Sequence, residues 1–196
     1  MNKSTENILP IDGRVIYHGK IFNQLESDDL FNKLRNNIEW KKDEVFIFGK
    51  HYITKREVAF YGTKELEYKY SNSIKTALHF TQELSQIKET VEKITKKNYN
   101  ACLLNLYPSG NEGMGWHCDN ESSIVKNSSI ASVSFGAERK FLLKHKTLAY
   151  SSSILLEHGS LLVMENETQH YWLHRLPVSK RVQQPRINLT FRQMYE

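Results

Sequence analysis

The sequence predicts an α+β fold in which a jelly-roll core over residues 98–196 follows two N-terminal helices. Before Asn98, hydrophobic residues recur at the three- and four-residue spacing of amphipathic helices. After Asn98 they form short segments rich in Val, Leu, Ile and Phe, which turn residues separate. The 196-residue chain has no repeat, linker or low-complexity block, so we expect one domain, 1–196. Its core would be a double-stranded β-helix, in which two sheets of short antiparallel strands face each other.

The first helix is expected to begin beside Ser27, whose side-chain oxygen can accept a hydrogen bond from the first helical turn. Its hydrophobic face would comprise Leu30, Phe31, Leu34 and Ile38. The second helix is expected over residues 73–96, which carry hydrophobic residues at helical spacing: Ile74, Leu78, Leu84, Ile87, Val91 and Ile94. Residues 1–12 are expected to be flexible.

The remaining segments are expected to be strands and turns. Residues 44–70 contain the hydrophobic run 45–48, the turn signal Gly49-Lys50 and a tyrosine-rich stretch. The strands of the C-terminal half are expected at 101–107, 130–135, 140–145, 153–156, 160–165 and 186–192.

The composition limits the class of protein. No run of 18 apolar residues is present, and the N-terminus lacks a hydrophobic signal region, so we expect no transmembrane helix and a location inside the cell. We also expect a monomer that does not bind membranes. The compartment would be the nucleus in a eukaryote and the cytoplasm in a bacterium. Two cysteines form no disulfide framework, which favours a reducing interior. The net charge of +5 suits an acidic partner such as nucleic acid, although a lysine-rich proteome would explain it equally well.

A metal site is the strongest functional signal. His117 and Asp119 are two residues apart, so in extended chain both side chains point to the same side. One further histidine downstream, His174, would complete a two-histidine, one-carboxylate facial triad, which binds non-haem Fe(II) and leaves positions open for substrate and O₂. Mn, Co and Ni bind similar sets. The third ligand could also come from one of the other histidines in the strand half: His145, His158 and His170.

The segment 186–192 alternates polar and apolar residues. On a β-strand, Arg186, Asn188, Thr190 and Arg192 point to one side. A co-substrate with carboxylates at both ends would explain two arginines and an amide on one face, because arginine forms bidentate pairs with carboxylates. Asn105 and Tyr107, also two residues apart on an expected strand, could add hydrogen bonds. The alternative is an ordinary solvated strand face.

Taken in order, these residues resemble the AlkB family of Fe(II)/2-oxoglutarate dioxygenases, and in particular its DNA-repair branch. The similar stretches span about Val45 to Gln193. They include Phe48-Gly49-Lys50, Arg56, Tyr61-Gly62, 68–71, 105–107, 117–121, 130–136, Phe141, His145-Lys146, 158–162 and 185–192.

The resemblance implies cofactors and their ligands. His117, Asp119 and His174 would bind Fe(II), and O₂ and 2-oxoglutarate would be co-substrates. Arg186 would lie at the distal carboxylate of 2-oxoglutarate and Arg192 nearer the metal. The residues around 2-oxoglutarate would be Asn105, Tyr107, Arg186, Asn188, Thr190 and Arg192.

The resemblance also implies a reaction, the repair of alkylated DNA by oxidative demethylation of 1-methyladenine and 3-methylcytosine. Formaldehyde, succinate and CO₂ would be released. The methyl group lies on the pairing edge of the base, so the base must be unpaired or flipped out of the helix. Residues 44–72 would form the nucleotide-recognition hairpins, a lid over the site. The substrate contacts implied are Phe48, Lys50, Arg56, Tyr68, Tyr70, Asn120 and Glu121.

Within this set, Tyr70 and His117 would sandwich the flipped base. Phe48 would be an intercalating finger, and the alternative for Phe48 is a buried hairpin aromatic. Lys50 and Arg56 would contact phosphates, or else belong to a solvated charged face.

Three other functions remain open on the sequence. RNA could replace DNA as the nucleic acid, because the metal and co-substrate residues would be the same. A 2-oxoglutarate-dependent hydroxylase of a protein or small molecule would also share them, although the positive charge, Phe48 and the tyrosines favour nucleic acid. A non-catalytic jelly-roll binding module is disfavoured by the intact triad and the two arginines.

Overall fold

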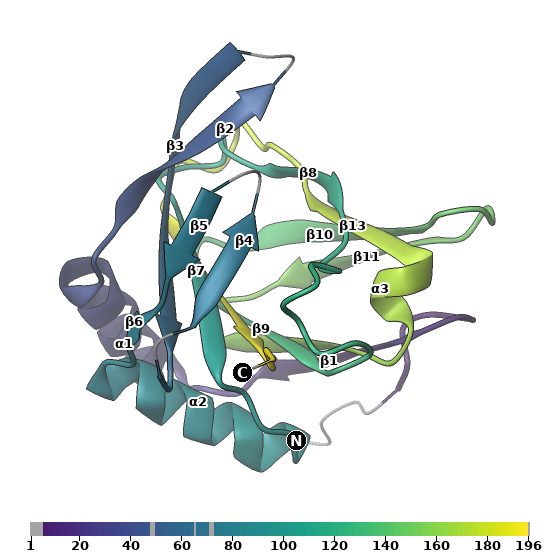
Figure 1. The fold of residues 1–196 in the computed structure, drawn as a ribbon, viewed down its shortest axis with the longest axis horizontal. Coiled ribbons are helices and arrows are strands. Elements are labelled where there is room, and N and C mark those ends of the chain that lie inside the picture. The colour runs from purple at the N-terminus through teal and green to yellow at the C-terminus, as the bar shows by residue number, and fades with distance from the viewer. Residues whose placement is uncertain (1–5, 48–49, 65, 71–72, 196) are drawn as a thin grey trace.

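Two β-sheets face each other, and two helices cover the outer side of the larger one (Figure 1). The computed structural model describes residues 6–47, 50–64, 66–70 and 73–195. The helices are α1 (Gln24–Asn37), α2 (Gln82–Thr95) and α3 (Thr168–Tyr171). The strands are β1 (Arg14–Lys20), β2 (Lys41–Ile47), β3 (Lys50–Gly62), β4 (Glu67–Tyr70), β5 (Ser73–Thr76), β6 (Leu78–His79), β7 (Ala101–Tyr107), β8 (Met114–His117), β9 (Ile130–Gly136), β10 (Arg139–His145), β11 (Ser151–Leu156), β12 (Ser160–Glu165), β13 (Trp172–Leu176) and β14 (Arg186–Arg192).

The larger sheet has the strand order β1-β12-β9-β14-β7-β3-β2, with β6 paired to β3. All its pairs are antiparallel except β3 with β6. Strand β14 lies in the centre, between β9 and β7. The predicted α+β jelly roll is therefore confirmed. The N-terminal strands β1, β2 and β3 also join this sheet, so its strands are not confined to residues 98–196.

The two faces of β14 have different surroundings. Ile187, Leu189 and Phe191 are fully buried in the core between the sheet and the two long helices. Burial of such side chains is the main favourable contribution to folding. The alternate residues, Arg186 to Arg192, face the smaller sheet and line a cavity. The predicted alternation along this strand is confirmed.

The smaller sheet has the order β11-β10-β13-β8. Its inner face packs against the larger sheet through a second hydrophobic cluster, which includes Leu143, Leu162 and Trp172. In the register of β13 with β8, His174 lies directly opposite His117. Cross-strand partners are close neighbours in space, so this pairing brings the two distant histidines together.

Helix α1 begins earlier than the sequence predicted. Asn23 is its N-cap, with its side chain accepting from the backbone N–H of Glu26 and the Glu26 side chain accepting from the N–H of Asn23. This reciprocal capping box satisfies two backbone donors. The expected start at Ser27 is therefore wrong. Ser27 lies inside the helix and is buried against Gly159, where an added Cβ would meet its Oγ at 2.1 Å.

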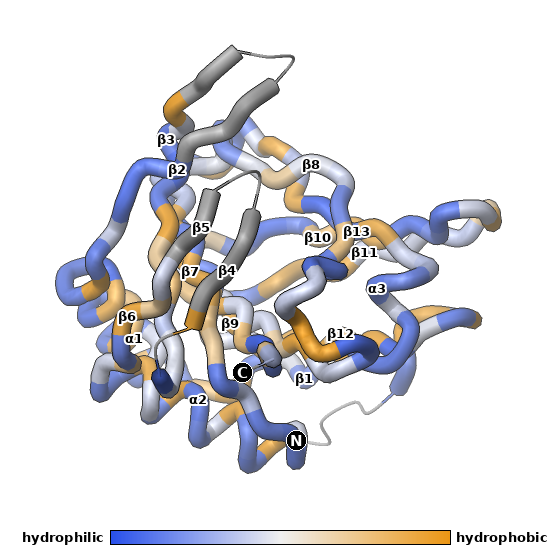
Figure 2. The backbone as a smooth tube through the Cα atoms, viewed as in Figure 1, coloured by the Kyte–Doolittle hydropathy of each residue, from blue (hydrophilic) through white to orange (hydrophobic). Residues whose placement is uncertain are grey.

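Helix α2 is shorter than predicted. Thr81 caps it, and residues 73–76 and 78–79 form strands β5 and β6 instead of its first turns. Ile74 and Leu78 fit helical spacing, but pairing of β5 with β4 and of β6 with β3 decides their conformation. Hydrophilic and hydrophobic residues alternate along α2 (Figure 2), and Leu84, Ile87 and Val91 supply its buried side.

The N-terminal segment also differs from expectation. Leu9 is 3% exposed and packs in the core between the sheets, and the N–H of Ile8 donates to the carbonyl of Val15. Residues 8 and 9 are therefore part of the packed fold, and residues 1–5 lie outside the described chain. Among the described residues, no helix is long and hydrophobic enough to cross a bilayer.

Candidate metal centre and adjoining cavity

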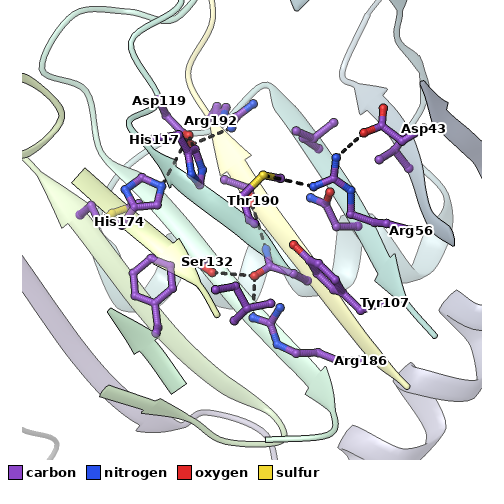
Figure 3. A pocket seen from close by; sticks show the side chains of 18 of the residues that line it. Asp43, Arg56, Tyr107, His117, Asp119, Ser132, His174, Arg186, Thr190 and Arg192 are labelled. Carbon is purple, nitrogen blue, oxygen red and sulfur yellow. Dashed lines mark hydrogen bonds and ion pairs between the residues drawn. The ribbon is translucent and has the colours of Figure 1, made fainter. Parts of the chain in front are cut away.

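Three potential ligands meet between the two sheets (Figure 3). His117 ends β8, Asp119 follows two residues later, and His174 lies in the middle of β13. The Nε2 atoms of His117 and His174 are each 3.7 Å from Oδ1 of Asp119, and the ligand atoms all lie within 4.8 Å of one another. No other such group of three occurs in the described part of the chain. Two imidazoles and one carboxylate suit a divalent transition metal such as Fe(II).

Burial and neighbouring charges together shift the pKa values of Asp119 and His174. Desolvation raises the pKa of Asp119, but the charge of Arg192 and then the two histidines outweigh it, and the pKa falls to about 2. Burial lowers the pKa of His174 to about 3, with partial opposition from Asp119. At neutral pH the site therefore holds an ionised carboxylate and a neutral imidazole. These are the protonation states that bind metal ions.

Hydrogen bonds orient two of the ligands. Nδ1 of His117 lies 2.8 Å from the carbonyl oxygen of Gly115, which can only accept, so Nδ1 carries the proton and Nε2 is free for a metal. Nη2 of Arg192 donates to Oδ2 of Asp119 at 2.7 Å, with both side chains almost fully buried. That bond leaves Oδ1 as the oxygen that faces the two histidines.

Beyond the triad, a polar network follows β14 along the cavity floor (Figure 3). Nη2 of Arg186 donates to Oγ of Ser134 at 2.9 Å and to Oδ1 of Asn188 at 2.8 Å. Asn188 in turn donates from Nδ2 to Oγ1 of Thr190 at 3.0 Å, and Ser132 donates to Asn188 at 3.2 Å. These bonds hold the polar side chains of β14 in fixed positions within one cavity.

Arg186 has capacity for an anionic ligand. It is 2% exposed, and among the described residues no acceptor lies within hydrogen-bond distance of its Nε. Burial lowers its pKa to about 10, so it stays charged at neutral pH. A buried cation that lines this cavity fits a carboxylate of 2-oxoglutarate, because a hydrogen bond between the two would be charge-assisted. The predicted neighbours Asn105 and Tyr107 line the same cavity from β7.

The remaining predicted substrate residues lie in different places. Glu121 lines the cavity, whereas Asn120 is exposed and lines a separate hollow beside Ile124 and His170. Asp119 and Glu121 line that hollow as well as the metal cavity, so the two adjoin, and the substrate contact of Asn120 stays a prediction. Phe48 lies outside the described residues. Lys50, Tyr68 and Tyr70 fall in strands β3 and β4, but their side chains lie outside what the structure describes.

Arg56 is a wall of the cavity and not a surface phosphate contact as expected. Its side chain is 8% exposed and forms an ion pair with the equally buried Asp43, and Nη1 lies 3.2 Å from Sδ of Met114 (Figure 3). Sequence reasoning missed Asp43 and Met114, since neither belongs to a recognisable motif. They reach the cavity because β2 pairs with β3 and because Met114 begins the strand that ends at His117.

Removing one member of this ion pair should destabilise the protein strongly. We expect Asp43→Asn to lower the free energy of unfolding by about 3 kcal/mol, because it leaves the Arg56 charge buried. The double variant Asp43→Leu with Arg56→Met should recover most of the loss. Urea denaturation measures both. As a control, Glu57→Gln breaks the more exposed Lys42–Glu57 pair of the same hairpin and should cost at most about 1 kcal/mol. Similar losses for both single variants would contradict the prediction.

The competing histidines have structural roles. His145 bonds to Asp12 at 3.2 Å through Nε2, and its Nδ1 accepts from the N–H groups of Thr147 and Leu148. Nδ1 of His158 accepts from the N–H of Gly136 at 2.8 Å. Both therefore use their ring nitrogens away from the cavity. Of the histidines considered, His174 is the one that lies with His117 and Asp119 in a group that could hold a metal ion.

Arg139 is a further residue whose role the sequence did not reveal. It is 2% exposed and donates to the carbonyl groups of Ser109, Glu112 and Pro177. Those bonds hold the loop that leads into β8 against the chain that follows β13. Arg139 thus helps to set the position of His117.

Comparisons with known proteins agree with this site. The family model described as the 2OG-Fe(II) oxygenase superfamily matches residues 13–192. The chain is 36% identical over 185 residues to the human DNA oxidative demethylase ALKBH2, covering 89% of this chain and 71% of that protein. It is 35% identical over 180 residues to the human alpha-ketoglutarate-dependent dioxygenase alkB homolog 3, covering 87% of this chain and 62% of that protein.

Solved structures show the same fold. The structure of OsALKBH1 superposes with a TM-score of 0.64 at 14% identity and covers 95% of this chain and all of that one. A 2OG-Fe(II) oxygenase family oxidoreductase from Burkholderia pseudomallei gives a TM-score of 0.60 at 12% identity, covering 93% and 85%. From the family match, the two relatives and the triad, the chain belongs to the AlkB family of the 2OG-Fe(II) oxygenase superfamily, a dioxygenase that uses Fe(II) and 2-oxoglutarate.

Proposed function

We propose that this enzyme repairs alkylated DNA by oxidative demethylation of N-methylated bases. The observation that carries the proposal is the His-Asp-His group, in which Asp119 and His174 are buried, and which lines the same cavity as the two arginines of β14. The name of the human relative, DNA oxidative demethylase, supports this reaction and this substrate. Lesions such as 1-methyladenine and 3-methylcytosine cannot pair normally, so less free energy is needed to flip them out of a duplex.

The cofactors and the side chains around them would have separate roles in the reaction. When bound, Fe(II) and 2-oxoglutarate supply the oxidation of the methyl group by O₂, with release of succinate and CO₂. His117, Asp119 and His174 would hold the metal, and Arg192 fixes the carboxylate of Asp119. Arg186 would bind the distal carboxylate of 2-oxoglutarate. Once the methyl group carries a hydroxyl, it leaves as formaldehyde and restores the base.

Apolar walls around the polar floor limit access of water. Val58, Leu103, Phe141, Met164 and Leu176 line the cavity and come from five different strands. Phe141 also packs against the ring of His174, with centroids 5.3 Å apart. A site that excludes water protects a reactive oxidant from side reactions. These side chains would also contact the apolar faces of a base.

The nucleic acid would bind on the side of the cavity where β2 and β3 form a long hairpin and β4 and β5 a short one (Figure 1). The predicted recognition segment 44–72 covers most of the long hairpin and strand β4 of the short one. We infer that Tyr70 with His117 holds the flipped base, and that Tyr68 and Glu121 border it. Lys50 would contact the phosphates of the nucleic acid, and Arg56 would face the flipped base from the cavity wall. As predicted from the sequence, the protein would act as a monomer inside the cell.

A direct assay tests the proposal. Purified protein with Fe(II), 2-oxoglutarate and O₂ is given oligonucleotides that carry one 1-methyladenine or one 3-methylcytosine. Single-stranded DNA, duplex DNA and RNA are compared by mass spectrometry. Loss of the methyl group that requires both Fe(II) and 2-oxoglutarate is the expected result, with DNA preferred. Faster reaction on RNA would identify an RNA demethylase. Formation of succinate without methyl loss would instead indicate hydroxylation of a protein or small molecule.

Phe48→Ala should impair duplex repair more than repair of single strands. An intercalating aromatic fills the gap that a flipped base leaves in a duplex, and a single strand has no such gap. Initial rates on matched single-stranded and duplex oligonucleotides measure the difference. Ile53→Ala is the control, because Ile53 is 65% exposed on the same hairpin. Equal losses on both substrates would exclude an intercalating role for Phe48.

A further inference from the structure

Asp119 lies where no strand pairing holds the backbone. Strand β8 ends at His117, and the chain then leaves the smaller sheet. His174, in contrast, is fixed within β13 by pairing on both sides, with β10 and with β8. The bond from Arg192 holds one carboxylate oxygen of Asp119 but not its backbone. A metal ligand at such a position needs another group to set where its Oδ1 points.

Gln169 supplies that group. Its Oε1 accepts from the backbone N–H of Asp119 at 2.9 Å. Its Nε2 lies 3.3 Å from Sδ of Met164, a buried residue of β12 that lines the metal cavity. The N–H can only donate and the thioether can only accept, so these two partners fix which end of the amide faces Asp119.

The helix that carries Gln169 is itself firmly anchored. Thr168, 1% exposed, accepts through Oγ1 from the N–H of Arg14 at 2.9 Å and donates to the carbonyl of Arg14 or of Glu165. These contacts fasten the short helix α3, which precedes β13 (Figure 1), to strands β1 and β12. Because Gln169 lies on this anchored helix, its hydrogen bond fixes the backbone of Asp119 relative to the larger sheet.

Lys146 also links helix α3 to the segment 117–119. Nζ of Lys146, the residue that follows β10, donates to the backbone carbonyl of Gln169 at 3.1 Å. The same Nζ lies 3.6 Å from Sγ of Cys118, the residue between the two metal ligands of this loop. The segment 117–119 is thus held at the main chain of Asp119 and at the side chain of Cys118.

We propose that Gln169 is a positioning residue, which fixes the backbone of Asp119 so that its free carboxylate oxygen meets the two histidines. The inference rests on the metal site and not on the nucleic acid substrate. Residues that orient metal ligands typically contribute between about tenfold and 100-fold in metal affinity. Gln169 should contribute near the lower limit, because Arg192 also holds Asp119.

The test uses the full-length protein freed of metal. Mn(II) is titrated in, and free Mn(II) is followed by electron paramagnetic resonance. Gln169→Met, which keeps the chain length but lacks the amide oxygen, should weaken Mn(II) binding by about tenfold. The amide hydrogen of Asp119 should exchange faster with solvent in the same variant, as NMR can measure. Gln86→Met, on the exposed side of α2, is the matched control and should change neither quantity.

A conservative variant separates positioning from a general loss of structure. Gln169→Glu keeps an oxygen that can accept from Asp119, so it should retain the slow exchange of that amide hydrogen. Gln169→Glu should bind Mn(II) with near wild-type affinity. This variant therefore keeps the test decisive even if Gln169→Met lowers the melting temperature of the metal-free protein. Unchanged Mn(II) affinity in Gln169→Met would overturn the proposal, as would equal losses of affinity and amide protection in both variants. Because neither readout involves DNA, a failed demethylation assay would leave this test valid.

Discussion

Replacing His174 with alanine is expected to abolish iron-dependent turnover of 2-oxoglutarate and to remove Fe(II) from the purified protein. His174 is 4% exposed, its pKa is held at about 3 by burial, and its Nε2 faces the carboxylate of Asp119. Without it the site keeps only one imidazole and one carboxylate. Two protein ligands cannot form the facial triad on which this class of iron site depends.

The fold itself should survive this change. The ring of His174 contacts the rings of His117 and Phe141, with centroids 4.2 Å and 5.3 Å apart, and pairs with Asp119, so most of these contacts lie within the site itself. We therefore expect a change in melting temperature of only a few degrees, corresponding to about 1–2 kcal/mol. His170→Ala is the control, because His170 is exposed four positions earlier. Iron content by elemental analysis and succinate formation measure the effect. Normal iron content with retained turnover in His174→Ala would refute the triad.

Replacing Arg186 with methionine is expected to raise the KM for 2-oxoglutarate by about 100-fold and to leave bound iron unchanged. Arg186 is the buried cation at the end of β14 away from the triad, whereas Arg192 bonds directly to Asp119. A hydrogen bond to a charged group contributes up to about 3 kcal/mol, and each 1.4 kcal/mol corresponds to about tenfold in affinity. Methionine fills the space without the charge.

A co-substrate that lacks the distal carboxylate makes this test specific. The wild-type enzyme should discriminate strongly against 2-oxopentanoate, which differs from 2-oxoglutarate only at that end. Arg186→Met should lose most of this discrimination. Arg35→Met, an exposed change on α1, should keep both the KM and the discrimination. If the variant still prefers 2-oxoglutarate as strongly as the wild type, another residue binds the distal carboxylate, and Arg192 would be the first to examine.

Several features of the fold and the site followed from local sequence patterns. Period-two alternation placed Arg186, Asn188, Thr190 and Arg192 on one side of a strand. The structure confirms this alternation: these four residues line the cavity, and Ile187, Leu189 and Phe191 lie in the core. Successive side chains on a strand point to opposite faces whatever the strand pairs with, so this property can be read from the segment alone. For the same reason, the two-residue spacing of His117 and Asp119 predicts that their side chains point to the same side.

The errors arose where contacts other than the hydrophobic spacing of the segment itself decide the conformation. Residues 73–79 fit helical spacing as well as α2 does, but pairing with β3 and β4 makes them strands. Ser27 and Asn23 are both good helix caps by residue type. The structure selects Asn23 because it forms the capping box with Glu26, while Ser27 is packed against Gly159.

The sequence by itself determined the chemistry of the site, because the residue types that bind iron and a dicarboxylate are few and their spacing along strands is regular. Only the tertiary structure decided which histidine completes the triad, since the register of β13 against β8 places His174, and not His145 or His158, opposite His117. It also decided that Arg56 is paired with Asp43 and that Gln169 holds Asp119. Contacts between residues far apart in the chain depend on how whole strands pack, and no local pattern encodes them.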